Sequence, residues 1–389
     1  MDVFVHIPKT AGSTLRAIIS REYGFRRVLY HQLQPGEKEN PALLKLLTAL
    51  GGTRLITGHH PYGIHAALKR RCRYFSMVRD PIRRAISDYY HAFGYPRHRW
   101  RDQILSGKLP IEQYLTDDRY TPGHWQAAML SAGRWRSPNS LAEIAIENVR
   151  TGFHAVGTSE RFIESVLFIA RALGWRPPLF ALKNVTRLDQ PLRTEREALE
   201  AEACARFKDH FEVDYRVYHA IDDLISEKIA AGGALFERAL TAFREIEADI
   251  AAHTRDRVFD PYEFAGDDVL PEPAARYLGS EPYRRIEEYL KNPLQQLGRN
   301  YMGRVDIADG QVVAGWAADL SRFEPIDVTI WQAGTIAGVA RCDLLREDLA
   351  RAGLGTSYLG FRCRLKEPIR DREGLVVCFE DTNIELEGV

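Results

Sequence analysis

The chain has 389 residues, with 53 Lys and Arg against 53 Asp and Glu, so its formal net charge is zero. This balance excludes a generally basic nucleic-acid coat protein, and the 45% apolar and 27% charged residues exclude global disorder. At roughly 150 residues per domain, the length predicts two or three domains.

Four short apolar segments, each followed by a helical pattern, predict strands in the first half of the chain. These segments are residues 3–7, 54–57, 74–78 and 153–156. Pro81 follows the third segment at a position that suits the first turn of a helix. Strands that alternate with helices indicate an α/β protein with a mainly parallel sheet.

The pattern of apolar, charged and turn-forming residues changes twice after this region. Residues 195–250 follow a helical pattern with a break at Gly232-Gly233, and residues 254–300 are rich in proline and charge. After Gly303, short β-rich runs alternate with Gly and Asp turns, which predicts a small β-sandwich. We therefore expect a first domain at 1–253, a linker with one short helix at 254–300, and a β-rich accessory domain at 301–389.

No targeting or metal-binding signal stands out. The five cysteines form no CxxC pair, so neither a disulfide framework nor a zinc ribbon is expected. The start of the chain lacks the basic and apolar segments of a signal peptide, and no run of about 18 apolar residues could span a membrane. These features predict a cytoplasmic protein with no transmembrane segment and no metal.

The loop between the first predicted strand and its helix has the composition of an anion site. Lys9 supplies a positive charge, Ser13 and Thr14 supply hydroxyl groups, and Gly12 allows a ligand to approach the backbone. A helix N-terminus at this point would favour a phosphate or sulfate. Lys9 precedes Gly12, which is the reverse of the Walker A order, so a nucleotide triphosphatase is disfavoured. A simple strand–helix turn is the alternative.

A second basic motif follows the third predicted strand. Arg79 ends that strand, and Ser87 lies eight residues further on in the next helix. Residues 69–101 hold ten Lys and Arg against two acids, Asp80 and Asp88, which indicates a local anion site in a neutral protein. Arginine binds phosphate bidentately, and a serine hydroxyl can complete the contact. The alternative is a solvated basic helix face.

The two motifs together resemble those of sulfotransferases that use 3′-phosphoadenosine-5′-phosphosulfate (PAPS). Residues 5–15 resemble the 5′-phosphosulfate loop of that family, and residues 78–90 resemble its 3′-phosphate motif. The resemblance covers residues 1–225 and is to the carbohydrate branch that includes heparan sulfate 2-O-sulfotransferase. It implies a P-loop-like sheet flanked by helices, with Arg79 and Ser87 at the 3′-phosphate. The residues that it places at the 5′ end of the donor are Lys9, Thr10, Ala11, Gly12, Ser13 and Thr14.

Gly58-His59-His60 follows the second predicted strand. In the resembling branch, a Gly-His pair at this place supplies the catalytic base, which corresponds to His59. A sugar hydroxyl is a poor nucleophile, and a histidine can accept its proton near neutral pH. His60 is expected to face elsewhere, where it orients a partner or binds the acceptor.

Two weaker segments extend the resemblance. Residues 156–162 resemble a family segment that packs beside the donor, with Glu160 as a helix N-terminal charge. Residues 183–186 resemble a later loop that closes over the donor, which makes Asn184 and Thr186 candidates for contact with the acceptor or for support of the site. The C-terminal part is similar to β-rich modules appended to bacterial glycan-modifying enzymes, and its Trp316 and Trp331 either pack in the core or stack on sugars.

These observations predict a metal-independent enzyme that transfers a sulfuryl group from PAPS to a carbohydrate or glycolipid hydroxyl by in-line displacement. Lys9 and His59 are the expected catalytic residues, and no nucleic-acid partner is expected. Two alternatives stay open: a P-loop nucleotide-dependent kinase, and a catalytically silent glycan-binding protein. The acceptor sugar and the oligomeric state are not indicated by the sequence.

Overall fold

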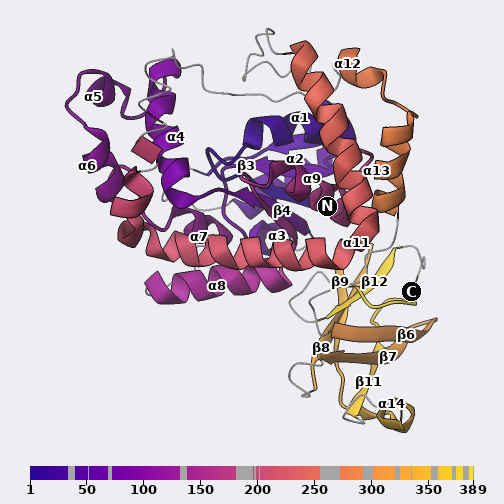
Figure 1. The fold of residues 1–389 in the computed structure, drawn as a ribbon. Helices are drawn as coiled ribbons and strands as arrows, with labels where there is room; N and C mark the ends of the chain where they lie inside the picture. Colours follow the sequence, from indigo (N-terminus) through magenta and orange to yellow (C-terminus); the bar gives the residue numbers. More distant parts are fainter. Residues whose placement is uncertain are drawn as a thin grey trace.

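The computed structural model describes most of the chain. The described residues are 1–33, 40–50, 52–68, 72–131, 138–180, 196, 199–200, 202–254, 272–291, 301–319, 325–333, 335–351, 358–369, 374–379 and 385–388. A parallel sheet with helices around it occupies the N-terminal part, and antiparallel strands form the C-terminal part (Figure 1). The predicted α/β class and the predicted C-terminal β structure are both confirmed.

The parallel sheet has five strands in the order β2-β3-β1-β4-β5. They are β1 (Asp2–Val5), β2 (Val28–Tyr30), β3 (Leu55–Gly58), β4 (Arg73–Val78) and β5 (Phe153–Thr158). Four of them match the predicted strands, whereas β2 is too short to show an apolar pattern in the sequence. β1 pairs with β3 on one side and with β4 on the other. The carboxyl end of β1 is therefore a topological switch point, where α/β proteins bind ligands.

Helices follow each strand of the sheet and extend the first domain. They are α1 (Gly12–Tyr23), α2 (Pro41–Leu50), α3 (Ile64–Leu68), α4 (Pro81–Gly94), α5 (Arg101–Leu105), α6 (Ile111–Thr116), α7 (Trp125–Leu130), α8 (Pro138–Thr151), α9 (Phe162–Leu173), α11 (Glu212–Thr254), α12 (Glu272–Ala275) and α13 (Glu281–Lys291), with 3₁₀ turns at Phe25–Arg27 and Lys208–Phe211. The start of α4 shows how local residues fix the point where a helix begins. Asp80 caps it by accepting the N–H of Arg83 at 2.9 Å, and Pro81 occupies its first turn, as expected.

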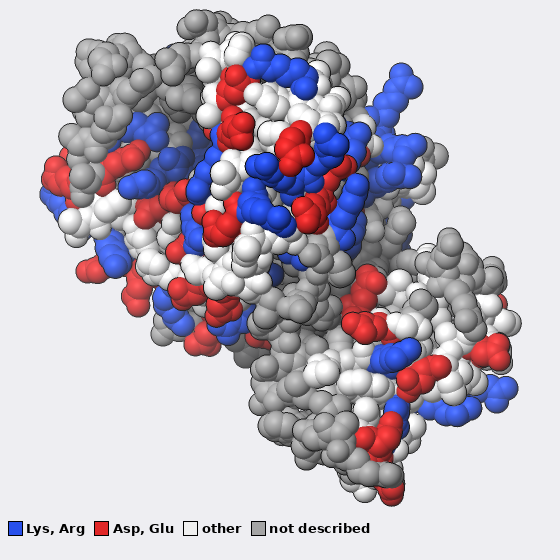
Figure 2. Space-filling view, turned by 45° about the vertical axis from the view of Figure 1, so that its right-hand side comes forward, with Lys and Arg blue, Asp and Glu red and all other residues white. Residues whose placement is uncertain are grey.

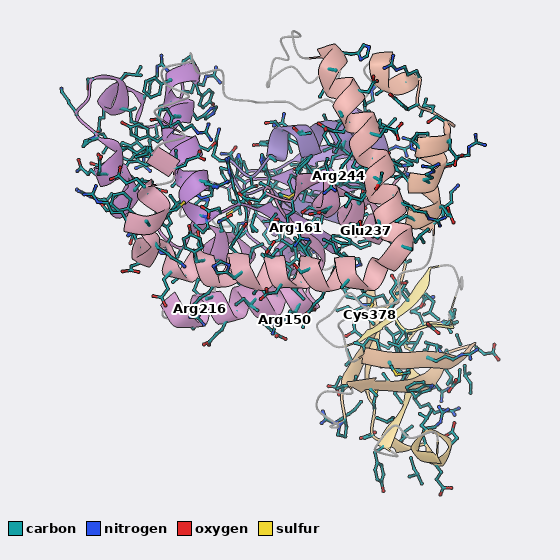
Figure 3. The ribbon with its side chains drawn as sticks, in the orientation of Figure 1. Arg150, Arg161, Arg216, Glu237, Arg244 and Cys378 are labelled. Carbon is teal, nitrogen blue, oxygen red and sulfur yellow. The ribbon has the colours of Figure 1, made fainter. Side chains whose placement is uncertain are left out.

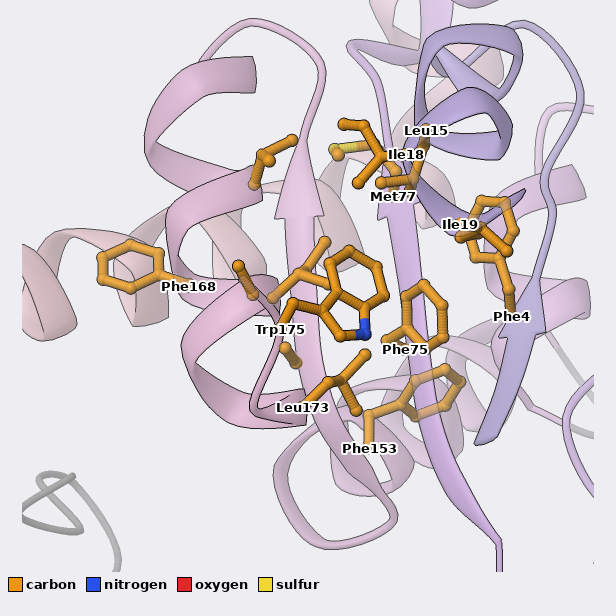
Figure 4. Close-up of a cluster of buried hydrophobic side chains, with 14 of the residues drawn as sticks. Phe4, Leu15, Ile18, Ile19, Phe75, Met77, Phe153, Phe168, Leu173 and Trp175 are labelled. Carbon is orange, nitrogen blue, oxygen red and sulfur yellow. The ribbon is translucent and has the colours of Figure 1, made fainter. Parts of the chain in front are cut away.

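The core of the first domain packs α1 and α9 against the sheet (Figure 4). Trp175, which follows α9, meets Phe75 of β4 edge-on, with 5.5 Å between the ring centroids. Its indole N–H donates to the Tyr23 hydroxyl at 3.0 Å, so the one polar atom of this large side chain is satisfied. Tyr23 in turn donates to Asp2, whose carboxylate also accepts two hydrogen bonds from Arg73 at 2.6 and 2.8 Å.

α11 is a long helix that turns sharply at Gly233. Gly233 has φ 53° and ψ −150°, a backbone conformation that favours glycine, so the break predicted at Gly232-Gly233 is confirmed. Figure 1 shows the two limbs of α11 on either side of this kink. The limb before the kink carries Tyr215, whose hydroxyl donates to Asp80 at the start of α4 at 3.0 Å.

Ion pairs connect both limbs of α11 to the start of α9. Arg161 lies 2.8 Å from Glu164 and 3.4 Å from Asp222 of the first limb. Arg244 of the second limb lies 3.3 Å from the same Glu164. Arg161 and Arg244 are labelled on this side of the molecule in Figure 3. The bend of α11 is thus held against one point of the sheet domain.

The C-terminal strands form two antiparallel sheets with a hydrophobic core of their own. The sheet orders are β10-β11-β7-β6 and β12-β8-β9. The elements are β6 (Tyr301–Asp309), β7 (Val312–Asp319), β8 (Asp327–Gln332), β9 (Thr335–Arg341), β10 (Leu344–Leu345), α14 (Glu347–Arg351), β11 (Tyr358–Arg364) and β12 (Leu375–Phe379). Trp316 packs beside Leu349 and Leu359 and is half-buried, as is Trp331.

The short helix expected within residues 254–300 is α13. Tyr283, Ile286 and Tyr289 of this helix are buried in the core of the first domain. The guanidinium of Arg171 on α9 lies 4.5 Å from the Tyr289 ring centroid, a cation–π contact. This part of the expected linker therefore packs onto the domain of the parallel sheet, and residues 255–271 and 292–300 lie outside the described residues.

Surface charges of both signs are mixed on the face that Figure 2 shows, in keeping with the zero net charge. This mixing gives no sign of a broad basic surface on that face. Among the described helices, none is both long enough and apolar enough to cross a membrane.

Candidate active site

A cleft of about 1510 Å³ opens at the carboxyl edge of the parallel sheet. Residues that follow four different strands line it: Lys9 after β1, His59 after β3, Arg79 after β4 and Glu160 after β5. Because the carboxyl ends of parallel strands meet at one edge, residues far apart in the sequence converge here. Both predicted anion motifs and the predicted base therefore face one cavity.

The loop between β1 and α1 has a strained backbone. Lys9 and Ala11 adopt positive φ angles of 70° and 61°, which residues other than glycine rarely do. Ala11 is the N-cap of α1, and it provides no side-chain cap for the helix. Left-handed residues that lead into a helix N-terminus direct successive N–H groups to one point, a geometry that binds anions. Strain of this kind is concentrated at functional sites.

Gly12 is required by a close approach rather than by its own backbone angles. A Cβ atom on Gly12 would lie 1.8 Å from Nε2 of His6. His6 is buried, its ring stacks on Phe4 with 5.3 Å between centroids, and burial lowers its pKa well below the ordinary value. A neutral His6 thus packs directly against the first turn of α1 and supports the loop.

The two predicted anion motifs are in direct contact. Nη1 of Arg79 donates to the main-chain oxygen of Lys9 at 3.2 Å. Nε of Arg79 lies 3.9 Å from a carboxylate oxygen of Glu160, which also accepts the N–H of Asp80 at 3.2 Å. These contacts hold the Arg79 guanidinium beside the loop.

The Lys9 ammonium is placed in the same cleft. Burial lowers the pKa of Lys9 to about 8, and the positive charge of Arg79 acts in the same direction, whereas the carboxylate of Asp88 opposes the shift. Desolvation of a cation makes it prefer an anionic partner. Ser87, on the inner face of α4, is buried and also lines the cleft.

His59 has a defined tautomer. Its Nδ1 lies 2.8 Å from the main-chain oxygen of His6, and a carbonyl only accepts hydrogen bonds, so Nδ1 carries the proton. Nε2 of the neutral ring is then the nitrogen with the lone pair. Burial lowers the pKa of His59, with the hydrogen bond to His6 opposing the shift. Gly58 before it has φ 146°, and a Cβ there would lie 1.7 Å from the main-chain oxygen of His31, so only glycine fits at this position.

Some predicted residues are not brought to the cleft. His60 is 1% exposed, its Nε2 has no hydrogen-bond partner among the described residues, and burial lowers its pKa to about 4, so it faces the protein interior. The Thr10 hydroxyl donates to the Ile7 oxygen at 2.8 Å, which makes this side chain part of the loop's internal support.

The two other predicted residues, Asn184 and Thr186, lie outside the described residues.

The cleft is also lined by polar residues that the sequence did not single out as site residues. Asp88 accepts a hydrogen bond from Tyr114 at 2.7 Å and lies 3.9 Å from Nε2 of His98. His91 stacks on Tyr95 with 5.0 Å between centroids, and burial lowers the pKa of His91 to about 4. The only hint in the sequence was that Asp88 is one of two acids in a strongly basic stretch.

The described part of the chain holds neither a cluster of metal-binding side chains nor a cysteine that lines the cleft. There, no group of three or more His, Cys, Asp or Glu side chains is placed to hold a metal ion. In the same described part, the five cysteines form no disulfide bond, and none of them lines the cleft.

Comparison with known proteins relates part of this chain to a sulfotransferase family. Residues 3–123 match the family model described as "Sulfotransferase family". This range contains both anion motifs and His59, and the match supports a sulfotransferase family for this part of the chain. The search of curated proteins found no match. Among solved structures, a sulfotransferase from Alicyclobacillus acidocaldarius is similar at 14% identity over 54% of this chain and 95% of that chain, with a TM-score of 0.28.

The pKa of Lys9 predicts a pH dependence for anion binding. A bound phosphate favours the charged ammonium, so the pKa of Lys9 is higher in the complex than its free value of about 8. The affinity for adenosine 3′,5′-bisphosphate should therefore be constant below that pH and fall as the pH rises through it. Calorimetric titrations between about pH 7 and 9.5 measure this, with Lys9→Arg as the control that keeps its charge. An affinity that stays constant in the unmodified protein would contradict the placement of Lys9.

Proposed function

We propose that this chain is a sulfotransferase that moves a sulfuryl group from PAPS to a hydroxyl of a carbohydrate or glycolipid. The observation that carries the proposal is the hydrogen bond from Arg79 to the Lys9 carbonyl. It joins a loop suited to a phosphosulfate with a strand end suited to a 3′-phosphate. The match of residues 3–123 to the sulfotransferase family supports the same class of reaction.

The cleft fits the two charged ends of such a donor. Lys9 and the first turn of α1, including Gly12, Ser13 and Thr14, would hold the 5′ end, because this helix start has no side-chain cap. Arg79 and Ser87 would hold the 3′-phosphate. PAPS supplies the sulfuryl group on a phosphate that leaves. The Lys9 ammonium would stabilise the negative charge that develops on that phosphate.

His59 is the proposed base for the acceptor hydroxyl. Its lowered pKa keeps the ring neutral at pH 7, and its Nε2 lone pair is available because Nδ1–H is committed to the His6 carbonyl. As the hydroxyl oxygen bonds to sulfur, its proton passes to Nε2. The resulting imidazolium is stabilised by the His6 carbonyl and by the Asp88 carboxylate, both of which raise the pKa of His59.

The residues that line the cleft beside the two anion motifs support a carbohydrate acceptor. Aromatic rings and hydrogen-bonding side chains line the cleft together, which is the combination that protein sites present to sugars. Trp100 and Tyr120 meet edge to face with 4.9 Å between centroids, and Asp88 and His98 line the same cleft. A sugar placed here would have its hydroxyl groups within the same cavity as His59.

We also propose a division of labour along the chain. Residues 1–253 would form the sulfotransferase domain, because both anion motifs and the base lie within it, and α13 would complete its core. Residues 301–389 would form an accessory domain, since their two sheets enclose a separate core. The module's resemblance to those of glycan-modifying enzymes suggests that it acts on the acceptor side of the reaction.

The direct test is transfer from labelled PAPS to a panel of carbohydrates and glycolipids. We expect labelled product with at least one acceptor, and the rate should be the same with and without EDTA, because the proposed residues supply the charge stabilisation. No transfer to any acceptor, together with phosphorylation that requires ATP and Mg²⁺, would contradict the proposal and favour a kinase.

The roles of Lys9 and the two histidines predict different kinetic effects. His59→Ala should lower kcat by about 10²–10⁴ and leave the donor Kd nearly unchanged, because a general base acts in the transition state. Lys9→Ala should lower kcat and weaken donor binding together. His60→Ala is the matched control, and it should cost less kcat than His59→Ala once both variants are shown to be folded. A larger loss of kcat for His60→Ala would show that the wrong histidine was chosen.

A further inference from the structure

Arg79 occupies a point where ordinary backbone pairing has ended. The β4–β5 ladder closes with the pair Val78 and Thr158, and α4 does not begin until Pro81. The main-chain N–H and C=O of Arg79 therefore have no partner in the sheet or the helix. Main-chain groups in such a place need another partner, because an unpaired buried amide is costly.

One side chain supplies both partners. Oε1 of Gln126 accepts the Arg79 N–H at 2.9 Å, and Nε2 of Gln126 donates to the Arg79 oxygen at 2.7 Å. Gln126 is 1% exposed and comes from α7, so it is fully committed to this contact. A primary amide that makes two such bonds imitates a neighbouring strand and leaves the Arg79 backbone little freedom.

Gln126 is itself held by a buried carboxylate. Asp214, at the start of α11 and fully buried, accepts the N–H of Gln126 at 3.0 Å and the N–H of Ala127 at 2.8 Å. Burial raises the pKa of Asp214 to about 7, opposed by these two hydrogen bonds and by the nearby charge of Arg84. A chain of hydrogen bonds thus runs from Asp214 of α11 through Gln126 of α7 to the main chain of Arg79.

We propose that Gln126 and Asp214 are positioning residues that aim the Arg79 guanidinium at the donor's 3′-phosphate. This inference rests on the proposed function of the cleft. The guanidinium lies between the Lys9 carbonyl, to which it donates, and Glu160, so its direction depends on how its origin at the end of β4 is fixed. Neither Gln126 nor Asp214 touches the ligand in this account.

The test compares two nucleotides that differ only at the 3′ position. Calorimetry gives the Kd of adenosine 3′,5′-bisphosphate and of AMP, and their ratio measures recognition of the 3′-phosphate. Gln126→Ala should reduce the preference for the bisphosphate by about tenfold, the effect of weakening one charged hydrogen bond, and leave the AMP affinity nearly unchanged. Gln113→Ala, an exposed glutamine on α6, is the matched control and should leave both values unchanged.

Further variants guard against an unfolded protein. Gln126→Glu keeps the size of the side chain and the acceptor for the Arg79 N–H, but it loses the donor to the Arg79 oxygen, so it should also lower the ratio. Asp214→Asn puts an amide N–H against a main-chain N–H and should act in the same direction, with exposed Asp223→Asn on the same helix as its control. In an Arg79→Ala background, Gln126→Ala should lower the ratio no further.

Two results would overturn the inference, and they are distinguishable. If the unmodified protein prefers the bisphosphate and every Gln126 and Asp214 variant keeps that ratio, or loses both ligands in parallel, these residues do not aim Arg79. If the unmodified protein shows no preference for the bisphosphate, the proposed function fails and the inference fails with it.

Discussion

The site depends on one hydrogen bond, from the Arg79 guanidinium to the main-chain oxygen of Lys9. Arg79 directly follows β4, Lys9 lies in the loop that follows β1, and β1 and β4 are neighbours in the sheet. The sheet therefore brings the two ends together before any side chain is considered. What the sequence adds is the chemistry at those ends: a strained loop that leads into an uncapped helix, and an arginine that reaches across to it.

Burial then tunes the groups that meet there. It lowers the pKa of Lys9, His6 and His59 alike, because the cleft removes water from cations without giving them enough anionic partners. An anion that binds in this cavity would therefore stabilise the buried positive charges, and the neutral imidazole of His59 lies beside it. Asp88 is a carboxylate within this cationic setting, and it raises the pKa of both Lys9 and His59. Under the proposed function, one surface would hold the leaving phosphate and the proton acceptor at the same time.

Local patterns in the sequence predicted the parts of this account that depend on neighbouring residues. The apolar runs located four strands of the sheet, the Pro8–Thr14 loop and Arg79 were found by composition and spacing, and the glycine pair predicted the kink in α11. β2 was missed because its three residues carry too little pattern. Gln126 and Asp214 were missed for a different reason: their role comes from packing between α7 and α11, and nothing near them in the chain marks it.

The central claim is that this cleft binds a nucleotide with phosphates at both the 5′ and the 3′ position. The most direct measurement is a calorimetric titration of the unmodified protein and of Arg79→Ala with adenosine 3′,5′-bisphosphate, with AMP, and with ATP in the presence of Mg²⁺. The account predicts that the unmodified protein prefers the bisphosphate and that Arg79→Ala loses about ten- to hundredfold in affinity for it, as expected for a charged contact, while AMP binding barely changes. Tighter binding of ATP with Mg²⁺ than of the bisphosphate, or equal losses for the bisphosphate and AMP in the variant, would contradict it.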